Sequence, residues 1–133
     1  MVWPATLLVI AGVGKSRATV GLKTSTRMVQ NVVIVDTIGE LRLGEATDAL
    51  RKVVHELLHQ GYRNILLNLG DVRHIDSSGI GELMSCYTSV TNQGGKLKLL
   101  HLNKNVRNLL QITRLYTIFE VEDDEQRAVA SFG

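Results

Sequence analysis

The sequence predicts a single α/β domain, in which a mixed, mostly parallel sheet of four to five strands packs with about four helices in the order ββαβαβαβα. Short apolar or β-branched runs alternate with segments whose apolar residues recur at helical spacing. Such alternation is typical of parallel strands joined by right-handed helical crossovers. The length of 133 residues suits one domain with one modest core.

The domain should begin with two strands and one helix. We expect a first strand at roughly residues 22–29, and a "QN" turn leads to the β-branched strand "VVIVDTI", residues 32–38. A loop should run from Gly39 to Ala46. The helix that follows, before the stop signal Gly61, is indicated by helical spacing of Ala49, Leu50, Val53, Val54, Leu57 and Leu58.

The apolar run "NILLNL", residues 64–69, predicts a buried central strand, which the loop "GDVRH" should follow. A second helix should begin near Ser77 or Ser78 and end at "NQGG". We then expect a strand over 96–102, a helix carrying Val106 to Ile112, and a strand over 117–121. A last helix in "DDEQRAVASF" has an acidic first turn, which the helix dipole favours.

Composition and charge exclude several classes of protein. Hydrophobic residues make up 44% and charged residues 21% of the chain, as in an ordinary globular domain. The net charge is +2 and the basic residues are scattered, which gives no reason to expect nucleic acid binding. Cys86 is the single cysteine, so an intramolecular disulfide is impossible, and we expect it in the core. A reducing, cytoplasmic location fits this composition.

Residues 1–20 are expected to form an extension outside the core, with the domain over 21–133. Their apolar stretch, residues 5–13, is too short to span a bilayer and lacks the preceding positive charge of a signal peptide. The segment "VIAGVGKS" ends like a phosphate-binding loop, but Val9 stands where that loop needs its first glycine. We therefore expect no nucleotide and no other cofactor.

Two segments resemble enzyme motifs but lack the other residues that those motifs need for catalysis. "HELLH", residues 55–59, has the zinc-protease spacing, yet a third ligand and a substrate cleft are missing from the pattern. His55 and His59 are better explained as a solvated helix face. Ser77 and Ser78 have no glycine two residues before them, as a hydrolase nucleophile would need. We expect no catalytic residue and no metal site.

The stretch "HIDSSGIGELM", residues 74–84, is the most informative segment. Ser and Asp are preferred helix N-caps, and Ser78 is expected to cap the helix or stabilise the loop, with Asp76 orienting the loop. Capping alone does not explain Gly79 and Gly81, each of which costs up to about 1 kcal/mol in a helix relative to alanine. Small residues around a hydroxyl would leave a bare surface that another protein can approach closely.

The chain here resembles the STAS domain of bacterial anti-sigma factor antagonists. "NILLNLGDVRHIDSSGIGEL" is similar to that family's strand, loop and phosphorylatable helix start. "NQGGKLKLL" resembles its Gly-Gly turn and next strand, and "VRNLLQITRLYTIFEVEDDEQRAVASF" its C-terminal elements. The front half, "IVDTIGELRLGEATDAL", is less specific. The resemblance covers about residues 22–132.

The resemblance implies a partner switch rather than an enzyme. The unphosphorylated antagonist would bind an anti-sigma factor, a serine kinase of the histidine-kinase-like ATPase fold, and so free the sigma factor. That kinase would phosphorylate Ser77, and a metal-dependent serine phosphatase would reverse the step. The alternative is a STAS scaffold or regulatory subunit of a stressosome or of a lipid or anion transporter complex; the intact DSSG favours the switch.

The resemblance also implies a partner-binding surface made of two segments. One is the motif itself, and the other is the loop after the second strand, where Arg42 stands in place of the acidic or polar residue of many relatives. The expected contact residues are Glu40, Arg42, Gly44, Asp76, Ser77, Ser78, Gly79 and Gly81.

Overall fold

The structure is a computed structural model that describes residues 21–133, where a five-stranded mixed sheet has the order β1-β2-β3-β4-β5. β1 runs antiparallel to β2, and the other neighbours are parallel. The predicted fold class is confirmed. The expected extension, residues 1–20, lies outside the described residues. The strands are β1 Leu22–Val29, β2 Val32–Leu41, β3 Asn64–Ile75, β4 Lys96–Leu100 and β5 Val121–Glu122.

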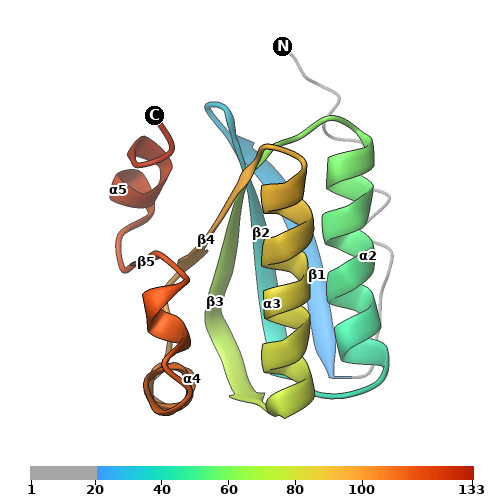
Figure 1. Cartoon of the computed structure of the whole chain (residues 1–133), viewed down its shortest axis with the longest axis vertical. Coiled ribbons are helices and arrows are strands. Elements are labelled where there is room, and N and C mark those ends of the chain that lie inside the picture. Colours follow the sequence, from blue (N-terminus) through green and yellow to red (C-terminus); the bar gives the residue numbers. More distant parts are fainter. Residues whose placement is uncertain (1–20) are drawn as a thin grey trace.

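Helices cover both faces of the sheet (Figure 1). They are α2 Glu45–His59, α3 Ser77–Asn92, α4 Lys104–Ile112 and α5 Glu125–Ala130, with a short 3-10 turn, η1 Leu115–Thr117. Figure 1 shows α2 and α3 side by side on one face, with α5 on the other. Successive strand residues point to opposite faces, so Val33 and Val35 join the large core under α2 and α3, whereas Val32 and Ile34 pack with α5.

β2 and β3 are longer than the sequence indicates. β3 does not end at residue 69 but continues through the expected loop to Ile75, and β2 runs past Gly39 to Leu41. The two strands remain paired as far as Leu41↔Ile75, despite register shifts between Asp36 and Ile38 and between Gly39 and Glu40. Because the pairing persists, the loop after β2 and the start of α3 emerge together at one edge of the sheet.

The last strand is shorter and later than the predicted 117–121. Leu115–Thr117 forms the turn η1, which follows Arg114 in a left-handed conformation with φ of 64°. Phe119 is buried and meets Tyr87 edge-to-face, with ring centroids 5.4 Å apart. Phe119, which the sequence assigns to a strand, therefore packs against α3 through Tyr87, and β5 begins only at Val121.

An ion pair between the half-exposed Arg51 and the buried Glu82 joins α2 to α3. The Nη2 of Arg51 lies 2.9 Å from Oε1 of Glu82, whose side chain is only 6% exposed. The other carboxylate oxygen, Oε2, accepts the Cys86 thiol at 3.5 Å. Cys86 is fully buried in the core, as predicted, and burial, together with Glu82, raises the pKa of its thiol.

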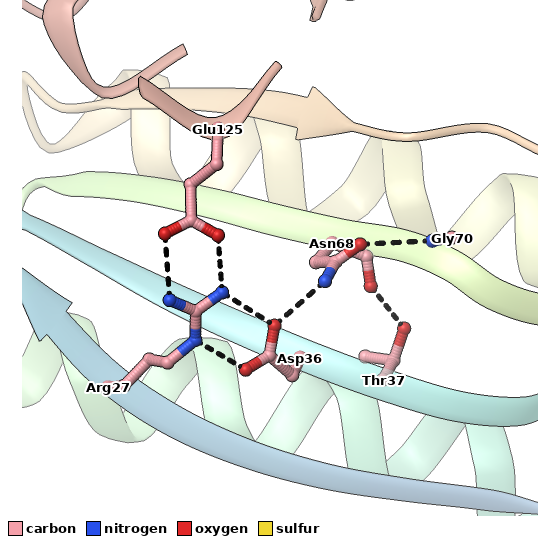
Figure 2. Close-up of polar contacts among 6 residues, drawn as sticks. All are labelled: Arg27, Asp36, Thr37, Asn68, Gly70 and Glu125. Atoms are coloured by element: carbon pink, nitrogen blue, oxygen red, sulfur yellow. Dashed lines mark hydrogen bonds and ion pairs between the residues drawn. The ribbon is translucent and has the colours of Figure 1, made fainter. Parts of the chain in front are cut away.

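On the opposite face, Arg27 of β1 holds the C-terminal helix to the sheet (Figure 2). Its guanidinium donates to both carboxylate oxygens of Glu125, at 2.7 and 2.9 Å, and to both of Asp36, at 2.6 and 3.2 Å. Asn68 of β3 donates to the same Asp36 at 2.8 Å. The hydrogen bond from Arg27 lowers the pKa of Glu125. Three strands and α5 therefore share one polar network.

Candidate functional site

The DSSG segment lies where β3 ends and α3 begins. Asp76 is the N-cap of α3, with extended backbone angles and an Oδ1 that accepts the Gly79 N–H at 2.8 Å. The expectation that Ser78 is the cap is therefore wrong: Ser78 already lies within the helix. The cap position belongs to the residue with extended backbone that directly precedes the first turn.

Asp76 also joins the motif to the loop after β2. Its Oδ2 accepts the Leu43 N–H at 3.1 Å, and its own N–H donates to the Leu41 carbonyl at 3.2 Å. Hydrogen bonds from the Gly79, Leu43 and Ser78 N–H groups lower the pKa of the Asp76 carboxyl, with Gly79 contributing most, and the charge of Arg42 lowers it further. Asp76 thus links the two segments that the resemblance implies as a partner surface, and its carboxyl is ionised at neutral pH.

Ser77, the first residue of α3, is exposed, and Ser78 is partly exposed. A hydroxyl at Ser77 is therefore reachable by another molecule. The ends of α2 and α3 that carry the two segments lie next to each other at the lower edge of the molecule in Figure 1.

Gly79 and Gly81 of the motif lie in different environments, so the lack of a side chain has a different consequence at each. Gly79 is buried, and a Cβ there would lie 2.4 Å from the Leu41 carbonyl oxygen and 2.7 Å from Cγ1 of Ile75. It is needed for close packing of α3 on the strand ends, not for an open surface as the sequence suggested. Gly81 is exposed with nothing within 4 Å of its Cβ position, and this glycine does leave a bare surface.

The end of β2 and the loop that follows it carry charged side chains and one exposed apolar side chain. Glu40 pairs with Arg42 at 3.4 Å and with Arg73 at 3.9 Å. Gly44 is the N-cap residue of α2, with a positive φ of 114° that suits glycine. Between them Leu43 is 76% exposed. Sequence reasoning missed Leu43, although a leucine between Arg42 and Gly44 in a polar loop is a signal that could have identified it.

The "HELLH" histidines lie on the exposed side of α2. His55 and His59, with Lys52, Ser89 and other side chains of α2 and α3, line a shallow groove of about 540 Å³. The Nε2 of His55 is 3.5 Å from Oγ of Ser89. Over residues 21–133, no cluster of three or more His, Cys, Asp or Glu side chains is suited to a metal ion. In the same range, no helix is long and apolar enough to cross a membrane.

Comparisons with known proteins agree on one family. Residues 23–128 match the STAS domain family. A Thermotoga neapolitana protein named as a homolog of an anti-sigma factor antagonist is 35% identical over 103 residues, covering 77% of this chain and 91% of that protein. The anti-sigma-B factor antagonist of Bacillus subtilis is 31% identical over 100 residues, covering 75% and 90%.

A solved structure agrees with these relatives. The crystal structure of an anti-sigma factor antagonist from Thermotoga maritima superimposes with a TM-score of 0.73 at 30% identity, covering 82% of this chain and 93% of that one.

Proposed function

Because this chain belongs to the STAS domain family, we propose that it is an anti-sigma factor antagonist controlled by phosphorylation of Ser77. In its unphosphorylated form it binds an anti-sigma factor that is also a serine kinase, and the sigma factor is released. The observation that carries the proposal is the exposed Ser77, held through its neighbour Asp76 beside the exposed loop of Leu43. The relatives named as antagonists support the same role.

The contact surface in this proposal combines an apolar anchor with a bare backbone. Leu43 offers a protruding side chain that a pocket on the partner can desolvate, and buried anchors of this kind dominate binding energy. Gly81 adds a position where the partner can approach the helix closely. Glu40 and Arg42 supply charges at the rim, which set specificity more than affinity.

Phosphorylation switches this surface off by adding charge and volume. The Ser77 Oγ attacks the γ-phosphorus of ATP in the bound kinase, the bond to ADP breaks, and the hydroxyl proton leaves to a base. The product carries about −1.5 to −2 charges and three acceptor oxygens. Loss of about 3 kcal/mol of interface energy lowers affinity more than about a hundredfold. A metal-dependent phosphatase hydrolyses the phosphoserine with water, which restores the serine and releases inorganic phosphate. The chain is therefore a substrate and a binding module in the cytoplasm.

The test is incubation of the protein with its co-encoded kinase and ATP, followed by phosphopeptide mass spectrometry. We expect one phosphate on Ser77. Ser77→Ala should stay folded, escape modification and keep the kinase bound, whereas Ser77→Asp should bind more weakly. Ser78→Ala is the matched control and should still be phosphorylated.

Two results would change the proposal. A phosphate on Ser78 would move the site by one residue and leave the switch intact. If neither serine is modified and Ser77→Asp binds like the wild type, the partner switch is wrong and a STAS scaffold or transporter subunit takes its place.

A further inference from the structure

Arg42 lies in the loop segment that is hydrogen-bonded to Asp76, the residue before Ser77. Asp76, the neighbour of Ser77, bonds to the backbone of Leu41 and of Leu43 at 3.2 and 3.1 Å. These two residues flank Arg42, so the position of its backbone relative to the start of α3 is fixed from both sides. The charge of Arg42 also contributes to the lowered pKa of Asp76, which indicates that the guanidinium is close enough to act on this end of the helix.

The present partner of Arg42 is weakly held. Its Nε lies 3.4 Å from Oε1 of Glu40, and the two side chains are 55% and 32% exposed. Ion pairs exposed to this degree contribute about 0–1 kcal/mol. Glu40 has a second cation, Arg73, at 3.9 Å, so it would keep a partner if Arg42 left.

A phosphate group competes well for such an arginine. The guanidinium is planar and donates two parallel hydrogen bonds to phosphate oxygens, and these charge-assisted bonds are stronger than those of a single exposed carboxylate contact. Other charged or titratable side chains on the segments that meet here are Asp76, Glu40, Arg73, His74 and Glu45.

We propose that Arg42 is the receptor for the phosphate on Ser77, and that it exchanges Glu40 for the phosphoserine. This inference rests on the proposed phosphorylation of Ser77. The exchange turns the Arg42 side chain from the strand end toward α3, across the surface next to Leu43. Phosphorylation would then alter the shape of the contact loop as well as its charge.

The experiment uses protein in which phosphoserine is inserted at position 77 during translation, so that no kinase is needed. The second pKa of the phosphate is measured by phosphorus NMR titration. In the wild type this pKa should lie below its ordinary value of about 6. Arg42→Gln should raise it by about half a unit or more, a change of about threefold in proton affinity, and Arg42→Lys should give an intermediate value.

Arg73→Gln is the matched control, because it removes the same charge from the other partner of Glu40. It should move the pKa less than Arg42→Gln does. Glu40→Gln should lower the pKa, and most of that effect should disappear when Arg42 is also replaced. Equal shifts for Arg42→Gln and Arg73→Gln, or no shift for either, would overturn the receptor role. Neither result bears on whether a kinase modifies Ser77, which the kinase assay decides separately.

Discussion

The Asp76 carboxylate accepts the backbone N–H of Leu43 at 3.1 Å, across 33 positions of sequence. The same carboxylate caps α3 through Gly79 at 2.8 Å. One side chain therefore fixes both the start of the helix that carries Ser77 and the loop that exposes Leu43. The predicted effects of substitution follow from this geometry.

Asp76→Ala should destabilise the fold by about 0.5–2 kcal/mol, because the cap of α3 is lost and the loop bond to Leu43 with it. Ser78→Ala should have a much smaller effect, since Ser78 is not the cap. Urea unfolding followed by circular dichroism measures both. A larger loss of stability for Ser78→Ala than for Asp76→Ala would show that Ser78 is the cap.

The contribution of Asp76 should also depend on pH. Its folded-state pKa is lowered, so the stabilisation by the carboxylate is fully present above its ordinary pKa of about 3.9 and is lost as the pH falls through the folded-state value. Asp76→Asn keeps a capping oxygen but cannot titrate. The stability gap between wild type and Asp76→Asn should therefore be constant near neutrality and shrink below about pH 4. Ser78→Ala should give a curve parallel to that of the wild type.

Replacing each glycine of the motif by alanine should change the stability of the fold in opposite directions. Gly79→Ala places a methyl group 2.4 Å from the Leu41 carbonyl oxygen, and overpacking of this kind costs about 1–3 kcal/mol. Gly81→Ala meets nothing within 4 Å and should stabilise α3 by about 0.5–1 kcal/mol, since alanine is the better helix former. Thermal unfolding of the two variants compares them directly, and similar melting temperatures would contradict the packing argument.

Leu43→Ala should weaken binding of the anti-sigma factor by about tenfold or more, the usual effect of truncating a central apolar anchor. Ile112→Ala is the control, because Ile112 is equally exposed, at 78% against 76% for Leu43, but lies at the end of α4. Both variants should melt like the wild type. Titration calorimetry with the purified partner gives the affinities; a stronger effect for Ile112→Ala would move the interface to α4.

Arg27→Gln should loosen α5 without unfolding the sheet. Arg27 makes hydrogen bonds to both Glu125 and Asp36, and loss of this partly exposed network should cost about 1 kcal/mol. Hydrogen exchange should quicken in Glu125–Ala130 more than in α3. Arg107→Gln removes one exposed contact, to Asp123 at 3.0 Å, and should leave exchange in α5 nearly unchanged.

The sequence predicts those parts of the fold that depend on local pattern. β1 matches its expected range, and α2 follows from the spacing of apolar residues that it buries. The end of β3 is different, because "GDVRH" is polar and becomes a strand only through its pairing with β2. The strand expected at 117–121 is wrong for another reason: after the left-handed Arg114, the 3-10 turn η1 takes up Thr117, and strand pairing begins only at Val121.

The sequence predicts which segments form the candidate site, but not how their residues are arranged. Asp76, Ser77 and Ser78 can each cap a helix, and only their backbone angles and the contact with Leu43 decide among them. The two glycines look alike in sequence, yet one is buried against Leu41 and the other is open. The exposure of Leu43 depends on how the loop leaves β2, which no local pattern encodes.

The ion pair between Arg51 and Glu82 has a kinetic consequence. It braces α2 against α3 one to two turns from the ends that carry Gly44 and Ser77. A partner that meets these ends finds a surface whose shape is set before contact, so little conformational freedom is lost on docking. If Ser77 is phosphorylated as proposed, encounter needs no slow rearrangement of this protein, and the affinity difference between the phosphorylated and unphosphorylated forms should lie in how long each complex lasts.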